Sequence, residues 1–214
     1  MKMILRVNSL MRTAALAIVA AAISAAALSA LAQTPPTAEI KPLDLARLTS
    51  TGTLQKPADL TRWIFLGTSL GMGYNPGSFN AANPGQFQVV LMEPTAYRYF
   101  VEHGSYAPGS MFMLAFYGAD MQVRSINQHG FTQSDLTNYE IHVIGPGKGV
   151  EGHSFYLFNA NSLEGNPVPP GSACMRCHVD HGAFNGTFAQ FYPTIRPLIP
   201  KEALERAAQD HDIH

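Results

Sequence analysis

Hydrophobic and polar residues alternate along several short segments of the chain, which is the pattern of half-buried β-strands. Residues 139–144 alternate in this way, and residues 111–117 are almost continuously apolar. The other segments with a strand-like pattern are 63–67, 87–92, 121–126 and 153–158. Turns rich in Gly and Pro separate them, such as the stretch 68–85. The pattern therefore predicts a sheet built from short strands.

Helical patterns are fewer and shorter. Glu93-Pro94 predicts the start of a helix, because proline is favoured in a first turn, and Gly104 predicts its end. Short helices are also expected over residues 44–48 and 200–209. A strand, a helix and then a meander of strands indicate an α+β fold, with one antiparallel sheet packed against a few short helices.

The first 32 residues have the pattern of a secretory signal peptide. A basic start that includes Lys2 precedes an apolar, alanine-rich stretch over 14–31. Ala-Leu-Ala at 30–32 matches a small-residue cleavage site, so we expect the mature chain to begin at Gln33. An uncleaved membrane anchor is the alternative, since the apolar stretch is near the lower length limit for crossing a bilayer.

Charge excludes some partners of the remaining chain. Over the full chain of 214 residues the net charge is −1, and only 14% of the residues are charged. No basic stripe exists to hold nucleic acid, and no polybasic patch exists to hold a membrane after signal cleavage. The remaining length suits one domain with a real hydrophobic core.

The strongest chemical signal is Cys174-Met175-Arg176-Cys177-His178, a C-x-x-C-H attachment motif for c-type haem. Thiols three residues apart can each add to one haem vinyl group, and the following histidine can then ligate the iron. We therefore expect one covalent haem c, with Cys174 and Cys177 as thioethers and His178 as the proximal ligand. Because c-type haem is attached outside the bacterial cytoplasm, the motif and the signal segment together predict the periplasm.

Three alternatives to haem attachment are open. A redox C-x-x-C of the thioredoxin type would normally lie early, between a strand and a helix. A zinc site from Cys174, Cys177, His178 and His181 would need an adjacent Cys and His to point at one tetrahedral centre. A disulfide between the two cysteines would be strained.

The sequence resembles the cytochrome P-460 family, which includes the cytochromes c′-beta. The matching stretches are residues 63–71, 92–97, 108–110, 155–158 and 174–191. The late C-x-x-C-H followed by Val-Asp-His-Gly-Ala is the most specific of them. The resemblance implies a homodimer with a curved antiparallel sheet and one haem per subunit, whose distal side is open to gases or small nitrogen species. Residues 33–60 would be a lead-in, 61–200 the haem domain, and 201–214 a C-terminal helix and tail.

The family divides by its chemistry. True P-460 enzymes have a lysine cross-linked to the haem and oxidise hydroxylamine, whereas c′-beta members lack the cross-link and bind nitric oxide or carbon monoxide under a phenylalanine-rich cap. The lysines of this chain are Lys2, Lys41, Lys56, Lys148 and Lys201. None lies in a predicted sheet strand, and this departure argues against hydroxylamine oxidation.

Aromatic residues occupy the strands instead. Phe112, Leu114 and Phe116 share one face of their predicted strand, and Phe87 shares a face of another with Val89. By spacing back from the haem motif, Phe87 and Phe116 best match the c′-beta capping pair. Ordinary core packing is the alternative, and in either case these residues would make a dry pocket that favours neutral diatomic ligands.

Polar candidates are fewer. Glu140 and His142 project from the same strand face, and Glu140 could match a family enzyme's distal carboxylate that serves as an acid or base. The alternative is a solvated strand face. His181 could contact a haem propionate or lie on the surface. The methionines that could provide a sixth iron ligand are Met72, Met92, Met111, Met113 and Met121.

We therefore expect a periplasmic c-type haem protein with His-ligated iron and an open apolar distal pocket, which binds nitric oxide or carbon monoxide or handles small nitrogen oxides. Two alternatives belong to other classes. One is an enzyme that oxidises hydroxylamine or converts nitric oxide. The other is an electron-transfer cytochrome with a Met or His distal ligand, which would need a redox partner protein.

Overall fold

The computed structural model of the chain describes residues 41–73, 84–121, 130–146 and 152–209, which belong to the unit Ile40–His214. The predicted signal peptide over 1–32 lies outside the described residues, as do Lys2, Lys148 and most of the predicted strand 121–126. Within the described part of the chain, no helix is long and apolar enough to span a membrane.

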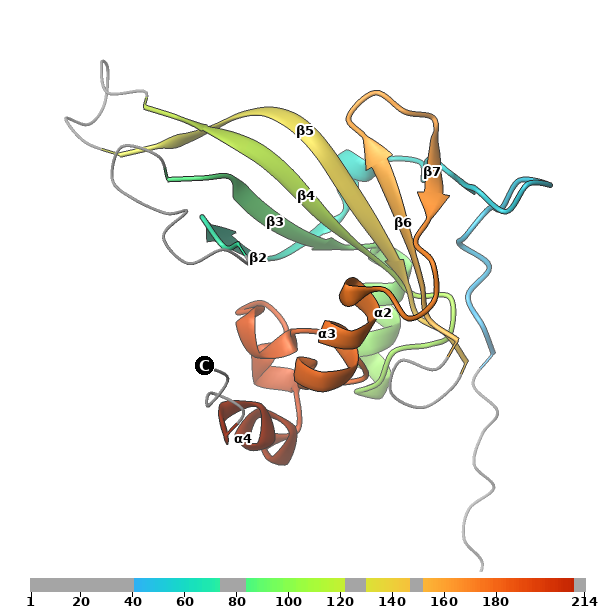
Figure 1. The fold of residues 1–214 in the computed structure, drawn as a ribbon. Helices are drawn as coiled ribbons and strands as arrows, with labels where there is room; N and C mark the ends of the chain where they lie inside the picture. Colours follow the sequence, from blue (N-terminus) through green and yellow to red (C-terminus); the bar gives the residue numbers. More distant parts are fainter. Residues whose placement is uncertain (1–40, 74–83, 122–129, 147–151, 210–214) are drawn as a thin grey trace, which may run out of the picture. The chain divides into compact units, whose positions relative to one another are not determined.

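An open antiparallel sheet of seven strands is the main element, and it is visibly curved (Figure 1). The strands are β1 (Leu54–Gln55), β2 (Ile64–Leu70), β3 (Phe87–Met92), β4 (Met111–Asp120), β5 (Thr132–Val143), β6 (Ser154–Asn159) and β7 (Glu164–Pro167). Their order is β1-β7-β6-β5-β4-β3-β2, so β2 to β7 form a meander and β1 adds to its β7 edge.

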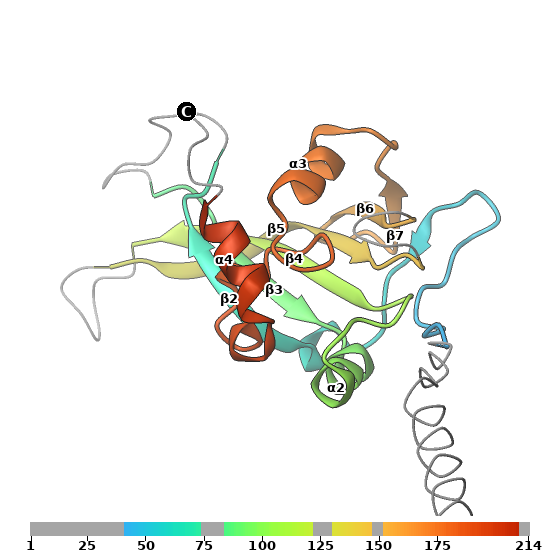
Figure 2. The same ribbon diagram turned by 90° about the horizontal axis from the view of Figure 1, so that it is seen from below.

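Three helices lie on one face of this sheet (Figures 1 and 2). They are α2 (Pro94–His103), α3 (Ala173–His181) and α4 (Lys201–Gln209), with short 3-10 turns η1 (Leu60–Arg62), η2 (Ala189–Phe191) and η3 (Arg196–Leu198). The predicted α+β fold, a curved antiparallel sheet with a few short helices, is confirmed.

The ends of α2 follow from its local sequence. The Glu93 side chain accepts a hydrogen bond from the Ala96 amide at 2.8 Å, which caps the first turn. Pro94 occupies the first helical position, and Gly104 ends the helix in the left-handed conformation at φ 65°. Both predicted boundaries are therefore confirmed.

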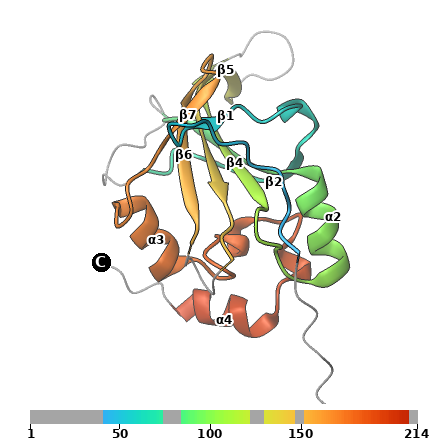
Figure 3. The same ribbon diagram turned by 90° about the vertical axis from the view of Figure 1, so that its right-hand side faces the viewer.

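We call the helix-covered side of the sheet its inner face. Here Met92 and Phe112 from the sheet belong to one buried cluster with Phe100 of α2 and Ala203 of α4. All four residues are at most 4% exposed. Figure 3 shows α3 and α2 flanking the strands, with α4 between them at the far end. The C-terminal helix is thus part of the same core as the sheet.

The opposite side, the outer face, has a second cluster. Tyr139 and Phe158 stack there with ring centroids 4.6 Å apart. Leu54 and Trp63 from the N-terminal segment belong to the same buried cluster. Burial of both faces explains why β4 reads as an almost continuous apolar run rather than a strict alternation.

Some predicted elements were wrong. Residues 44–48 form no helix; Leu48 instead forms an isolated antiparallel bridge with Leu54. β5 begins at Thr132, well before the predicted 139, because its first residues are polar and carry no alternating signal. β7 has the sequence Glu-Gly-Asn-Pro, which lacks a strand pattern, and its pairing with β6 stabilises it.

Candidate functional site

A cavity of about 390 Å³ lies between α3 and the inner face of the sheet, and we call it the central cavity. Its lining consists of Gly67, Thr68, Ser69, Met72, Gly73, Gln88, Val90, Phe112, Met113, Leu114, Phe116, Glu140, His142, Phe155, Cys174, Cys177, His178, Thr187, Phe188, Phe191 and Tyr192. Most of these residues are apolar. Its volume is in the range of small-molecule and cofactor sites.

The sheet register forms the floor of the central cavity, because directly paired residues of antiparallel strands point to the same face. Three cross-strand rows result: Ser69–Gln88–Phe116, Gly67–Val90–Leu114–Glu140, and Phe112–His142–Phe155. All of these residues line the cavity. The floor is therefore aromatic and aliphatic, with Gln88, Glu140 and His142 as its main polar groups.

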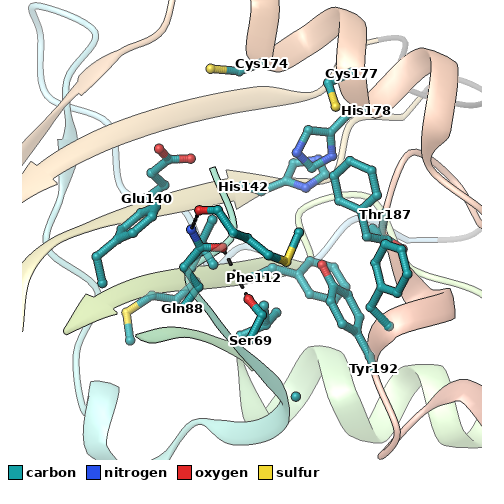
Figure 4. A pocket seen from close by; sticks show the side chains of 18 of the residues that line it. Ser69, Gln88, Phe112, Glu140, His142, Cys174, Cys177, His178, Thr187 and Tyr192 are labelled. Atoms are coloured by element: carbon teal, nitrogen blue, oxygen red, sulfur yellow. Dashed lines mark hydrogen bonds between the residues drawn. The ribbon is translucent and has the colours of Figure 1, made fainter. Parts of the chain in front are cut away.

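The helix α3 supplies the wall opposite this floor. Ser172 caps it by accepting a hydrogen bond from the Met175 amide at 3.4 Å. Cys174, Cys177 and His178 are three and four residues apart, so they lie on one helical face. All three line the cavity (Figure 4), and both cysteines are free thiols. Burial, followed by nearby Asp180 and Cys174, raises the pKa of the Cys177 thiol.

One hydrogen bond orients His178. Its Nδ1 lies 2.6 Å from the backbone oxygen of Gly186. Because a carbonyl oxygen only accepts, Nδ1 must donate, and the lone pair of the neutral ring is then on Nε2. Burial lowers the pKa of His178, which favours this neutral form. Second-partner contacts of this kind typically set the tautomer of a metal-binding histidine.

His142 takes part in a buried polar pair beside His178. Its Nε2 lies 2.9 Å from Nδ1 of His153, and both residues are at most 7% exposed. The His142 ring stacks on Phe155 at 4.2 Å and meets the ring of His178 edge-on at 5.0 Å. Burial first, and then His178, lower the pKa of both His142 and His153. The pair is therefore neutral near pH 7.

Glu140 reaches the same cavity from β5. It pairs with Leu114 on one side and Leu157 on the other, so its carboxyl group has aliphatic neighbours on the sheet. Burial raises its pKa. The predicted shared face of Glu140 and His142 is confirmed, and a proton donor or acceptor is thereby placed in the cavity.

The predicted cap formed by Phe87 and Phe116 is wrong, because the two side chains lie on opposite faces of the sheet. Phe116 pairs with Gln88 and faces the central cavity, whereas Phe87 pairs with Tyr117. Because neighbouring residues of a strand point to opposite faces, Phe87 projects from the outer face. Phe116 shares the inner face with Phe112, so these are the two phenylalanines of β4 that line the cavity.

The candidate sixth ligands are mostly elsewhere. Met92 and Met111 are buried in the two core clusters, and Met121 is 62% exposed. Met113 borders the cavity, but its register puts its side chain on the outer face with Leu91. Met72 therefore remains the methionine beside the cavity. His181 is absent from the lining.

Several lining residues were missed by the sequence reasoning. Gln88 accepts from the Ser69 hydroxyl at 3.3 Å and donates to the Met72 carbonyl at 2.9 Å (Figure 4). The Thr187 hydroxyl lies 3.2 Å from that of Tyr106. A polar Gln88 within an apolar strand was the available signal, whereas nothing local marks Thr187.

The arrangement fits a covalently attached haem. Two free thiols and an imidazole whose Nδ1 is bonded to the Gly186 carbonyl line one mostly apolar cavity, as two thioethers and one bond from Nε2 to iron require. In the described ranges, no group of three or more His, Cys, Asp or Glu side chains is arranged to hold a metal ion. The four-ligand zinc alternative therefore has no support.

Comparisons with known proteins add no assignment. No protein-family model matches the chain, and no curated protein sequence matches it significantly. The resemblance to the cytochrome P-460 family accordingly stays a prediction from the motifs.

Proposed function

We propose that this chain is a periplasmic c-type haem protein that binds nitric oxide or carbon monoxide, or handles small nitrogen oxides, in the central cavity. The observation that carries the proposal is the hydrogen bond from His178 Nδ1 to the Gly186 carbonyl, because it leaves Nε2 free on the side chain that follows the C-x-x-C thiols. The cytochrome P-460 resemblance supports the same reading.

Each residue has a role in this proposal. Cys174 and Cys177 would hold the haem through thioether bonds, and His178 Nε2 would ligate its iron. When bound, the haem would supply a gas-binding iron centre and a reversible one-electron couple. Phe112 and Phe116 exclude water from the floor, which favours neutral diatomic molecules over hydrated anions.

Spectroscopy and mass spectrometry test this function. We expect the protein, produced with a cytochrome c maturation system, to have the mass of the chain plus one haem. The reduced form should be high-spin and five-coordinate, and its absorption spectrum should shift on addition of carbon monoxide. Cys174→Ser with Cys177→Ser should abolish covalent attachment. A low-spin spectrum without added ligand would contradict the open position and favour an electron-transfer cytochrome.

An enzyme that acts on hydroxylamine or nitric oxide is the second candidate, and Glu140 favours it. A buried carboxyl group with a raised pKa can exchange a proton with a molecule in the cavity. Of the described lysines, Lys41, Lys56 and Lys201 do not line the cavity, and so none is placed for a cross-link to haem. Turnover of hydroxylamine that Glu140→Gln abolishes would favour this candidate over gas binding.

A further inference from the structure

A second cavity of about 440 Å³ lies beside the central cavity, and we call it the polar hollow. Strands β5, β6 and β7 form it. Its lining includes Asn138, Asn159, Asn166 and Glu164, with Glu140 at one side. The amides and carboxylates of this lining contrast with the apolar floor of the central cavity.

The two cavities lie side by side on the inner face. The row of paired residues that runs from Leu114 to Glu140 continues to Leu157 on β6 and Asn166 on β7. Glu140 lines both cavities, so it lies at their junction. The sheet thus carries one continuous surface that is apolar towards β3 and β4 and polar towards β7.

The carboxyl group of Glu140 is suited to such a junction. Its burial is intermediate, and desolvation is the one cause that raises its pKa, without a contribution from a charged neighbour. In the hollow, Glu164 is engaged by the Thr53 hydroxyl, which donates to its Oε2 at 2.7 Å. The other titratable groups that line the two cavities are Glu164 from β7, His142 from β5, Cys174, Cys177 and His178 from α3, and Tyr192.

We propose that the polar hollow is the access route by which water, protons and hydrophilic small molecules reach the central cavity. At the junction Glu140 takes up a proton from water in the hollow, releases one to a molecule in the central cavity, and hydrogen-bonds polar molecules as they cross. The inference rests on the proposed function for what the cavity holds. A hydrated molecule loses hydrogen bonds against Phe112 and Leu114, whereas the amides of the hollow can replace them. Neutral gases have no such requirement and can cross the apolar walls.

Blocking the hollow tests the route. Asn159→Trp adds a large ring to a side chain that lines the hollow and lies at the end of β6. Its matched control is Leu163→Trp, at a position on the same connection that is 77% exposed and lies outside the lining. The measurements are the association rates of imidazole with the ferric protein and of carbon monoxide with the ferrous protein.

In Asn159→Trp, imidazole association should slow by about tenfold or more, while carbon monoxide association changes less than about twofold. Leu163→Trp should change neither rate. If Asn159→Trp proves unstable, Asn159→Leu should give a smaller slowing in the same direction. Equal rates in the variants and the natural protein, or equal slowing of both ligands, would overturn the route.

Infrared spectroscopy tests Glu140 without reference to rates. Photolysis of the carbon monoxide complex across a range of pH values should produce a carboxylic C=O difference band, because burial raises the pKa of Glu140. Glu140→Gln should remove this band, and Glu164→Gln should retain it. A band that persists in Glu140→Gln, or no band across this range, would remove Glu140 from the junction. A protein that binds neither ligand would instead contradict the proposed function, so the two failures are distinct.

Discussion

Single contacts decide the chemistry of the histidines. His178 donates its Nδ1 proton to a backbone carbonyl, whereas His142 and His153 are hydrogen-bonded to each other. Three imidazoles close together in a buried region would repel one another if protonated. Their neutral forms are therefore the ones compatible with the fold.

The pH dependence of the free energy of unfolding should reveal the buried pair His142–His153. Burial, followed by His178, lowers the pKa of His153 from 6.5 to about 4. In that interval the unfolded chain binds more protons than the folded one, so the contribution to stability is present above pH 6.5 and is lost as pH falls towards 4. His153→Gln, which can keep a hydrogen bond to His142, should flatten this part of the curve by about 1 kcal/mol or more.

Urea unfolding at a series of pH values measures this effect. His103→Gln is the control, because His103 is an exposed residue at the end of α2. The same slope in His153→Gln and the natural protein would contradict the assignment to His153.

At the scale of elements, strand pairing decides which aromatic residues reach the cavity. β3 and β4 are in continuous register from Phe87–Tyr117 to Met92–Phe112. A shift by one residue would exchange the two faces of a strand. Pairing between strands therefore determines which phenylalanines lie on the floor of the cavity, and spacing along the chain does not.

Two alanine substitutions test whether Phe116 or Phe87 faces the cavity. Phe116→Ala should widen the cavity and change the carbon monoxide association rate by about tenfold, while Phe87→Ala should change it less than about twofold. Each should cost on the order of 1–3 kcal/mol of stability, because both side chains are half-buried. Flash photolysis gives the rates. A larger effect from Phe87→Ala than from Phe116→Ala would show that the register is wrong.

At the scale of the whole described unit, both faces of the sheet carry a buried core, and the inner face also carries the two cavities. The core of the outer face includes Leu54 and Trp63 from the N-terminal segment. Within the described residues, the Tyr139 hydroxyl of this core is buried without a hydrogen-bond partner. Burial of an unpaired hydroxyl is unfavourable, so its removal should stabilise the outer core.

Tyr139→Phe should raise the free energy of unfolding by about 1 kcal/mol, because it removes the unpaired hydroxyl and keeps the ring stacked on Phe158. Carbon monoxide binding should be unchanged, since Tyr139 is absent from the lining of the central cavity. Chemical denaturation and ligand titration measure the two quantities. Tyr156→Phe is a comparison on the same face. A loss of stability in Tyr139→Phe would show that the hydroxyl is satisfied in solution.

The α+β class and the bounds of β3 and α2 could be predicted from the sequence alone. These features depend on neighbours within one or two turns of chain, where side-chain period and capping residues act directly. Only the tertiary structure decided that Phe116 faces the cavity and Phe87 does not, and that β1 pairs with β7 at the edge of the sheet.

Only the tertiary structure also decided the position of the Gly186 carbonyl that orients His178 and the polar hollow beside Glu140. Each arises where segments distant along the chain, or joined by a turn of irregular geometry, are brought into contact. The physical reason is that register and turn geometry set these contacts, and neither leaves a periodic pattern in the sequence. The local sequence thus determined the spacing of the two thiols and the imidazole, and the packing of the sheet decided what surrounds them.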